Sequence, residues 1–385
     1  MSKRKICVVI TARPSYSRIK SALDAIKDHS DLELQLVITG SALLEKYGSV
    51  IDFIESDGFT ISEKVYVVVE GEGPNVMAKT TGLAVLELAN VFYNLKPDIV
   101  IVIADRFETL AVSIAASYQN ICLAHVQGGE VTGNIDEKVR HANTKLANIH
   151  LVATEDARKR VIQLGEDPEY VHNTGCPSID IASEVLQSPN IDFNPLTKYN
   201  GVGNPVNCQD DYLVVLQHSV TSEFASSREQ IFATLNAIHD LKIPTFWFWP
   251  NVDSGSDEIS AGIRSFREKF NSENIYYFKS MDPKDFLKLI YNSKCLIGNS
   301  SVGIRESSYL GIPVVNIGTR QQRRARGKNV IDVDNDKDAI MNAIKKQLTI
   351  GKYDSNNIYG DANSGKKIAE VLAKSPLSSH KTIMY

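Results

Sequence analysis

The chain has 385 residues and a formal net charge of −4 at pH 7, with 43% hydrophobic and 23% charged residues. This length exceeds the roughly 100–200 residues typical of one domain, so we expect two. The near-balanced charge argues against a nucleic-acid or anionic-membrane partner, and no apolar run approaches the roughly 20 residues that span a bilayer.

Val- and Ile-rich runs alternate with amphipathic segments, a pattern typical of parallel sheets with helices on both faces. In the first half we predict strands at 6–11, 34–39, 61–69, 99–104, 121–125, 150–153 and 171–173. Helices between them include 17–27, 76–95, 109–117 and 154–164. A stretch rich in Pro, Asn and Gly then interrupts the alternation at 188–208.

The alternation resumes with predicted strands at 212–216, 244–249, 275–278, 294–297 and 312–317, and with helices at 228–240, 259–270 and 283–291. We therefore predict an α/β protein of two Rossmann-like, doubly wound domains facing a cleft. The predicted bounds are 1–188 for the first domain, 189–211 for a linker and 212–385 for the second domain. We also consider that the last helix packs back on the first domain.

Ligands of doubly wound domains bind outside the carboxyl ends of the strands. Arg13 follows the first predicted strand and Ser17 lies at a helix start, where together they suit a diphosphate. The alternative is a surface arginine beside a capping serine. Asp105 follows the strand 99–104 and is either a catalytic carboxylate at the cleft or the N-cap of the next helix.

The densest polar run of the chain follows the apolar residues 121–124. It contains His125, Gln127, two glycines, Asp136 and His141. Such a run also fits a solvated helix start, but its position in a Gly-rich loop beyond a buried strand favours function. Because the H-x-x-x-H spacing is absent, we predict no metal.

The second half offers three further polar loops. His218 follows the strand 212–216, and Asn251 and Asp253 lie in the loop after the strand 244–249. Each signal is weak alone, and the convergence of several strand-end loops is what indicates a site.

The run 297–333 is the most informative one in the chain. Ser300, Ser301 and Gly303 lie at a strand-to-helix turn, where small residues and a helix N-terminus favour a phosphate. Glu306, one turn later, suits a ribose diol, and Arg320 opens a local basic loop. The pattern predicts a nucleotide-diphosphate site, and it is not a dinucleotide fingerprint because no G-x-G-x-x-G occurs here. The alternative is an ordinary βαβ turn with a serine cap.

The five cysteines are scattered and form no C-x-x-C pair, so we expect neither disulfides nor a zinc knuckle. The first residues lead directly into a strand without the apolar segment of a signal peptide. We therefore expect a cytoplasmic protein.

Six motifs together resemble the hydrolysing UDP-N-acetylglucosamine 2-epimerases. This group includes the bacterial sialic-acid-pathway enzymes and the epimerase half of the animal bifunctional epimerase/kinase. The resemblance extends from about Lys5 to Lys374. The motifs are ADRFET (104–109), HVQGGEVTGNIDEKVRHANTKLA (125–147), TGCPSIDIA (174–182), WPNVDSGS (249–256), IGNSSVGIRE (297–306) and NIGTRQQRRARGKNV (316–330).

The resemblance implies a GT-B-like fold in which the second domain holds most of the UDP, a homodimer or homotetramer, a UDP-sugar substrate and no cofactor. It implies that Ser301 and the backbone near Gly303 hold the diphosphate, with Glu306 at the ribose and Arg320 beside the nucleotide. The candidate catalytic residues are Arg13, Asp105, His125, Gln127, Asp136, His141 and His218. The candidate substrate- and nucleotide-binding residues are Arg13, Ser17, His218, Asn251, Asp253, Ser300, Ser301, Gly303, Glu306 and Arg320.

Two positions depart from the pattern of this family. Gln127 stands where a glutamate is usual, and Pro14-Ser15 replaces Ala-Asp or Ala-Glu. Glutamine can hydrogen-bond a sugar or water but cannot transfer a proton. Three explanations follow: the remaining acids suffice, the substrate is a modified sugar such as a diacetamido-trideoxyhexose, or the chain binds a nucleotide sugar without turning it over.

The reaction implied begins with departure of UDP from C1, which makes the C2 proton removable. Elimination gives a 2-acetamidoglucal, and water adds to give free N-acetylmannosamine. Asp105 and Asp136 are the candidates for handling the C2 proton and the water. Competing hypotheses are a non-hydrolysing epimerase, a GT-B glycosyltransferase and a non-catalytic nucleotide-sugar-binding protein.

Overall fold

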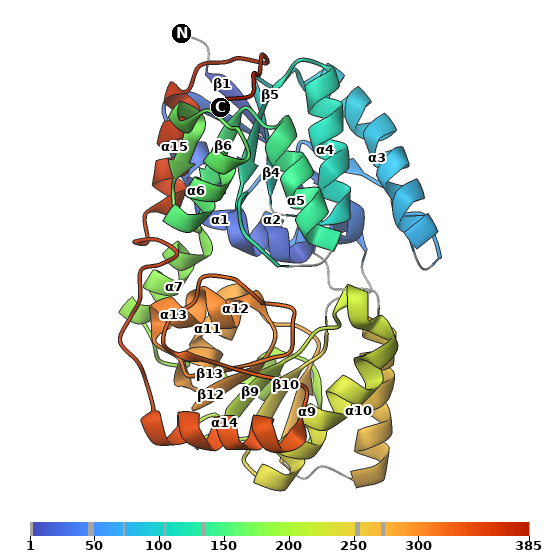
Figure 1. Cartoon of the computed structure of the whole chain (residues 1–385), viewed down its shortest axis with the longest axis vertical. Helices are drawn as coiled ribbons and strands as arrows, with labels where there is room; N and C mark the ends of the chain where they lie inside the picture. The colour runs from blue at the N-terminus through green and yellow to red at the C-terminus, as the bar shows by residue number, and fades with distance from the viewer. Residues whose placement is uncertain are drawn as a thin grey trace. The chain divides into compact units, whose positions relative to one another are not determined.

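The computed structural model describes residues 3–44, 50–71, 74–103, 105–132, 135–250, 255–270 and 274–384. They form two compact units (Figure 1). The first unit comprises residues 1–130, 135–180 and 359–385, and the second comprises 131–134 and 181–358. Residues 189–211, the segment expected to link two domains, contain α8 (Pro195–Lys198) and β8 (Gly201–Gly203) and belong to the second unit.

The first unit is built on a parallel sheet of seven strands in the order β3-β2-β1-β4-β5-β6-β7. All five residues of the central strand β4 are buried, because helices cover both faces of the sheet. The strands are β1 (Arg4–Ile10), β2 (Leu32–Thr39), β3 (Glu63–Val65), β4 (Ile99–Ile103), β5 (Cys122–Val126), β6 (Ile149–Val152) and β7 (Val171–Asn173).

Alternate residues of β1 face two different hydrophobic cores, one on each side of the sheet. Ile6, Val8 and Ile10 pack with α1, α2 and α15, whereas Cys7 and Val9 pack with α3 and α4. The helices are α1 (Arg13–Asp28), α2 (Val50–Ser56), α3 (Pro74–Leu95), α4 (Phe107–Tyr118), α5 (Ile135–Leu146), α6 (Glu155–Gln163) and α15 (Ser364–Lys374). Helix α7 (Ser178–Gln187) begins in this unit and continues into the second.

The second unit is built on seven strands in the order β14-β13-β12-β9-β10-β11-β8, of which β8 is antiparallel to its neighbour. The strands are β9 (Leu213–Leu216), β10 (Thr245–Phe248), β11 (Ile275–Phe278), β12 (Cys295–Gly298), β13 (Val314–Ile317) and β14 (Val330–Val333). The helices are α9 (Ser227–Leu241), α10 (Ser256–Phe270), α11 (Pro283–Asn292), α12 (Ser301–Ile304), α13 (Glu306–Leu310) and α14 (Lys337–Ile350).

Each sheet contains one point where the strand order reverses, between β1 and β4 in the first unit and between β9 and β12 in the second. Chain connections leave such a point in opposite directions, so a crevice opens at the carboxyl ends of the two strands. The predicted fold class is confirmed: both units are doubly wound α/β structures. The fold class could be predicted from the alternating segments because buried parallel strands are continuous Val/Ile runs.

Several element bounds differ from the prediction. Helix α1 begins at Arg13, four residues earlier than expected, because Pro14 lies in its first turn, where proline is tolerated. Strand β3 covers only Glu63–Val65 of the predicted 61–69. Helices α2 and α14 and strand β14 were not predicted at all.

The last helix, α15, packs on α1 in the first unit (Figure 1, red beside blue). Its N-terminal backbone N–H groups at Ser364 and Gly365 donate to the carboxylate of Asp180 at 3.0 and 2.8 Å. At its other end, Arg4 donates to the carbonyl oxygens of Leu372 and Ser375. These contacts satisfy N–H and C=O groups that a helix leaves unpaired at its two ends.

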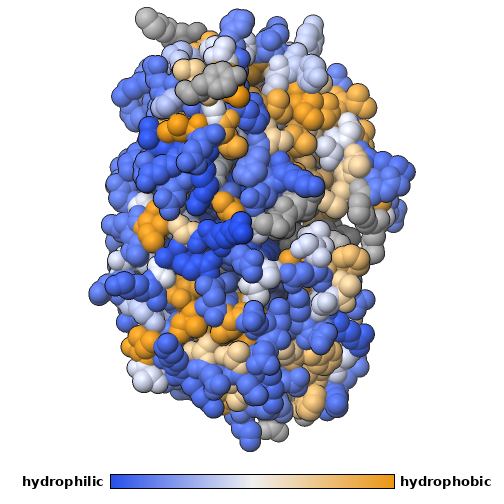
Figure 2. Space-filling view, in the orientation of Figure 1, coloured by the Kyte–Doolittle hydropathy of each residue, from blue (hydrophilic) through white to orange (hydrophobic). Residues whose placement is uncertain are grey.

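Hydrophilic residues cover most of the face drawn in Figure 2, and the apolar residues there form separate patches. No helix within the described ranges combines the length and apolar character needed to cross a bilayer.

We predict that Gly365→Ala destabilises the first unit by about 1–3 kcal/mol, the usual cost of overpacking. A Cβ at Gly365 would lie 2.3 Å from the carbonyl oxygen of Ser21 on α1, so the two helices would have to separate. Urea unfolding followed by circular dichroism measures the loss. Gly82→Ala is the matched control, because nothing lies within 4 Å of its Cβ on α3. An equal response of the two variants would contradict the prediction.

Candidate functional site

At the reversal point of the first unit, Asp105 follows β4 and contacts a buried arginine. Arg140 on α5 donates to Oδ2 of Asp105 through both Nε, at 3.1 Å, and Nη2. Its Nη1 donates to the backbone oxygen of Glu130 at 2.8 Å. The side chains of Arg140 and Asp105 are 1% and 13% exposed, so the ion pair is largely withdrawn from water. Arg140 therefore connects the end of β4, the loop after β5 and α5.

Two opposing effects act on the pKa of the Arg140 guanidinium. Burial alone would lower the pKa of its guanidinium, but the carboxylates of Asp105, Glu130 and Asp136 together raise this pKa above its ordinary value. Two predicted site residues thus stabilise the charged form of Arg140: Asp105 by direct contact and Asp136 by electrostatic attraction. The N-cap alternative for Asp105 is wrong, because α4 begins at Phe107 and its N-cap residue is Arg106.

Two predicted residues lie on β5 and directly after it. His125 belongs to the strand itself, is fully buried, and its Nδ1 lies 3.1 Å from Oγ1 of Thr144 on α5. Gln127 follows the strand with a φ of 67° and donates from Nε2 to Sγ of Cys176 at 3.0 Å. His125 therefore lies in the strand, as the predicted strand 121–125 had it, and the Gly-rich loop begins after it.

The remaining candidates of the first unit lie on helices. The guanidinium of Arg13 stacks 4.8 Å from the ring centroid of Phe53 on α2. Ser17 lies one turn into α1 and does not cap it, because the N-cap is Ala12. Nε2 of His141 lies 3.4 Å from Oε1 of Glu137, one turn earlier on α5.

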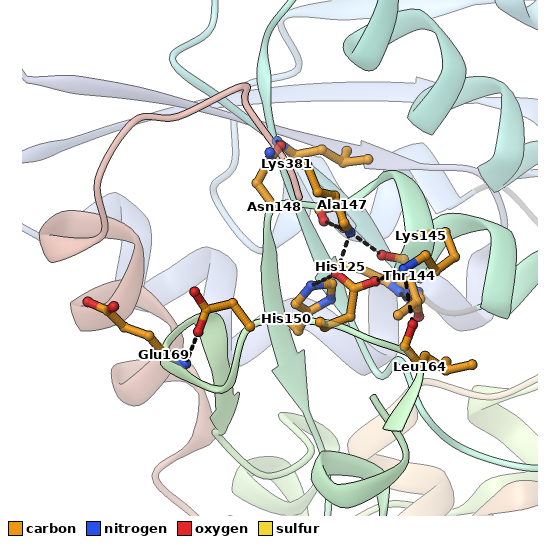
Figure 3. A network of polar contacts seen from close by, with 12 residues as sticks. His125, Thr144, Lys145, Ala147, Asn148, His150, Leu164, Glu169 and Lys381 are labelled. Atoms are coloured by element: carbon orange, nitrogen blue, oxygen red, sulfur yellow. Dashed lines mark hydrogen bonds and ion pairs between the residues drawn. The ribbon is translucent and has the colours of Figure 1, made fainter. Parts of the chain in front are cut away.

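A network of polar contacts lies at the C-terminal end of α5 (Figure 3). The amine of Lys381, near the C-terminus, donates to the backbone oxygens of Thr144 and Ala147 at 2.9 and 2.5 Å. It also lies 2.5 Å from Oε2 of Glu166. The tail residue thus satisfies carbonyl groups at the C-terminal end of α5, whose first turns carry Asp136 and Arg140.

Glu166 is the centre of this network. Its side chain is 2% exposed and contacts Lys145 at 2.7 Å and Nε2 of His150 at 3.0 Å, besides Lys381. Burial alone would raise the pKa of Glu166, but the contacts with His150, Lys145 and Lys381 lower it to about 2. Burial also lowers the pKa values of His150 and Lys381.

At the reversal point of the second unit, Asn299 connects the two strand ends. Its Oδ1 accepts from the backbone N–H of His218 at 2.7 Å, and its Nδ2 donates to the backbone oxygen of His218 at 2.8 Å. The preceding Gly298 has a φ of 130°, and a Cβ there would lie 2.1 Å from the oxygen of Leu216. The ends of β9 and β12 therefore approach as closely as only glycine permits.

The basic loop packs on the same asparagine. Arg320 and Gln321 donate to the backbone oxygen of Asn299 at 3.3 and 2.9 Å. Arg326 donates to the backbone oxygens of Gln321 and Arg324, as well as to Asp332, so it holds the loop together. Arg320 is therefore a basic residue of this loop that lies directly at the strand end.

The helix predicted to follow β12 and to carry Glu306 is interrupted. Helix α12 consists of one turn, and the chain breaks at Arg305 before α13 begins at Glu306. The helix dipole expected at Ser301 is correspondingly small. Ser300 is the N-cap of α12, as the alternative hypothesis proposed, and Gly303 packs on β13, where a Cβ would lie 3.0 Å from Val314.

Three of the buried polar atoms of the second unit that have no hydrogen-bond partner among the described residues belong to the predicted site or flank it. They are Oε2 of Glu306, and Oε1 of Gln217 and Oγ of Ser219 on either side of His218. Each of these atoms is available for a hydrogen bond with a ligand or with water. Sequence reasoning singled out Glu306 but missed Gln217, Ser219 and Asn299, although all follow buried strands.

Asn251 and Asp253 lie outside the described residues. In the part of the chain that the structure describes, no group of three or more His, Cys, Asp or Glu side chains is placed to hold a metal ion.

The fold is shared with solved structures. The crystal structure of UDP-GlcNAc 2-epimerase from Neisseria meningitidis, bound to UDP-GlcNAc, matches with a TM-score of 0.81 at 17% sequence identity. The match covers 96% of this chain and 100% of that one. At this identity the similarity establishes the fold, which is the GT-B-like pair of α/β units.

Sequence comparison adds the family. The family model described as UDP-N-acetylglucosamine 2-epimerase matches residues 24–373. A Legionella pneumophila protein named UDP-N,N'-diacetylbacillosamine 2-epimerase (hydrolyzing) is 32% identical over 98% of this chain and 97% of its own length. Polysialic acid biosynthesis protein P7 of Escherichia coli is 35% identical over 89% and 85%, respectively. The chain therefore belongs to the UDP-N-acetylglucosamine 2-epimerase family, which confirms the resemblance of its motifs.

We predict that Lys381→Met lowers stability at pH 7 by about 1–3 kcal/mol, because it removes one partner of a buried carboxylate. The pKa of Glu166 lies below its ordinary value of 4.5, so its contribution is present above pH 4.5 and is lost as the pH falls toward 2. The difference between variant and wild type should shrink over that range.

Thermal unfolding at a series of pH values measures this effect. Lys374→Met is the control, because Lys374 forms an exposed pair with Glu370 on α15 and such pairs contribute less than about 1 kcal/mol. A pH-independent difference for Lys381→Met would show that the Glu166 network does not carry it.

Proposed function

We propose that the chain is a hydrolysing 2-epimerase that converts UDP-N-acetylglucosamine to N-acetylmannosamine and UDP. The observation that carries the proposal is the Asp105 carboxylate held by buried Arg140 at the reversal point of the first sheet, in a chain of this family. The hydrolysing branch is supported by the relative named as a hydrolysing epimerase, at 32% identity over nearly the whole chain.

In the first proposed step, UDP leaves C1 of the sugar. Ser301 and Arg320 are assigned to the nucleotide, and Arg13 and His218 to the charge that gathers on the diphosphate. The unpartnered Oε2 of Glu306 supports its assignment to the ribose, because a diol offers two O–H donors to a carboxylate.

In the second step, the C2 proton is lost to give a 2-acetamidoglucal, and water adds to give the free sugar. Asp105 and Asp136 are assigned to the proton and the water. Asp105 contacts Arg140, and the charge of Asp136 also raises the pKa of Arg140, which supports placing both carboxylates in one functional group. Gln127 is assigned to hydrogen bonding of the sugar or the water, because an amide cannot exchange a proton in this role.

A second candidate substrate is a UDP-linked diacetamido-trideoxyhexose. The relative named for UDP-N,N'-diacetylbacillosamine supports it, as does the amide at position 127 on the sugar side of the proposed site. The two substrates differ at C4 and C6 of the sugar, while the chemistry at C1 and C2 is the same.

The test is a proton NMR time course with each UDP sugar in D2O. Free 2-epimer and UDP, with deuterium incorporated at C2, are the expected products. A product that keeps UDP attached would identify a non-hydrolysing epimerase. UDP binding without turnover of either sugar would overturn the proposal in favour of a nucleotide-sugar-binding protein.

Two matched carboxylate-to-amide variants separate the proposed roles. We predict that Asp105→Asn lowers kcat by about 10²–10⁴-fold, the usual effect of losing an acid–base group, with the Kd for UDP unchanged within about twofold. Glu306→Gln should instead raise the Kd for UDP by roughly tenfold or more, since it loses a charge-assisted hydrogen bond. Isothermal titration and the NMR assay measure the two quantities. Near-normal turnover of Asp105→Asn would refute its assignment.

A further inference from the structure

Gln127 adopts an unusual backbone conformation. Its φ of 67° lies in the left-handed region, which residues other than glycine rarely adopt. The backbone N–H of Gln127 donates to the oxygen of Leu151 on β6 at 2.9 Å, and two glycines follow. Such a conformation persists only where surrounding contacts determine it.

The side chain of Gln127 has a defined partner. Its Nε2 donates to Sγ of Cys176 at 3.0 Å, and this sulfur lies 3.0 Å from Oγ of Ser178. Gln127, Cys176 and Ser178 are 2%, 0% and 5% exposed. Because all three are buried, water does not compete with the thiol for the amide. The N–H end of the amide points toward the sulfur.

Cys176 is itself rigidly held. Its N–H donates to the oxygen of Tyr359 at 2.7 Å, and its own oxygen accepts from Ile179 at 2.9 Å. A Cβ on the preceding Gly175 would lie 3.1 Å from Cα of Gly360. Cys176 thus sits where the chain leaves the first unit after Asp180 and returns to it at Tyr359.

We propose that Cys176 is a positioning residue that fixes the orientation of the Gln127 amide for turnover. This inference rests on the proposed function, in which Gln127 contacts the sugar or the water. Cys176 does not touch the substrate; it acts through Gln127. A backbone that is held at Leu151 and a side chain that is held at Cys176 leave the amide one orientation.

A double-mutant cycle tests the proposal with Gln127→Ala, Cys176→Ala and the double variant. Each single change should lower kcat roughly tenfold, the kinetic equivalent of one hydrogen bond, and leave the Kd for UDP unchanged. The double variant should be no slower than the slower single variant, because both changes remove the same interaction. Cys176→Ser, which retains a hydrogen-bond acceptor, should recover part of the lost kcat.

Cys7→Ala is the matched control, since Cys7 is also 0% exposed and lies on β1 of the same unit. It should lower Tm without changing kcat beyond twofold. A wild-type kcat for Cys176→Ala, or losses that multiply in the double variant, would overturn the positioning role.

The Tm values of the same four proteins separate this inference from the proposed function. A Tm loss in the double variant that is smaller than the sum of the single losses supports the contact, whatever the substrate, and additive losses overturn it. If the wild-type protein turns over neither UDP sugar, the proposed function fails, and the role of Cys176 in turnover fails with it. The Tm cycle still decides whether Gln127 is fixed by Cys176.

Discussion

The candidate site depends on the side-chain contacts that hold neighbouring strand ends together in each sheet, at or beside the point where the strand order reverses. At such a point two neighbouring strands end beside each other while their connections diverge, so backbone groups at the strand ends lose the ladder partners that they would otherwise have. In the second unit Asn299 replaces those partners, because its amide pairs with both the N–H and the C=O of His218. The backbone oxygen of Asn299 also accepts hydrogen bonds from Arg320 and Gln321, so the same residue positions the basic loop.

In the first unit an ion pair connects the ends of two other neighbouring strands, β4 and β5. Arg140 contacts Asp105 beyond β4 and the backbone of Glu130 beyond β5, and it is almost completely buried. The two solutions differ in consequence. Loss of a neutral amide leaves unpaired backbone groups, whereas loss of one member of a buried ion pair leaves an uncompensated charge, which typically costs about 3–5 kcal/mol. Asp105 therefore stabilises the first unit, in addition to being a candidate catalytic residue.

The sequence predicted those features that are local. Continuous Val and Ile runs indicated the buried strands, and polar residues directly after them indicated Asp105, Gln127, His218 and the turn at Ser300. Contacts between distant residues left no local pattern. The Gln127–Cys176 contact joins positions 49 residues apart, and the contact from Lys381 to Thr144 spans 237. The early start of α1 and the break at Arg305 escaped prediction because helix propensity weakly determines where a helix begins or breaks.

These long separations have a consequence for how the chain folds. Apart from residues 131–134, the second unit is one continuous segment, whereas the first is completed only by residues 359–385. Helix α15 covers α1, and Lys381 satisfies the C-terminal end of α5, so the helix that carries Asp136 and Arg140 reaches its full set of contacts only when the end of the chain arrives. Closing so long a loop slows folding through its entropic cost. The first unit, which holds the candidate catalytic acids, is therefore the unit whose assembly depends on the rest of the chain.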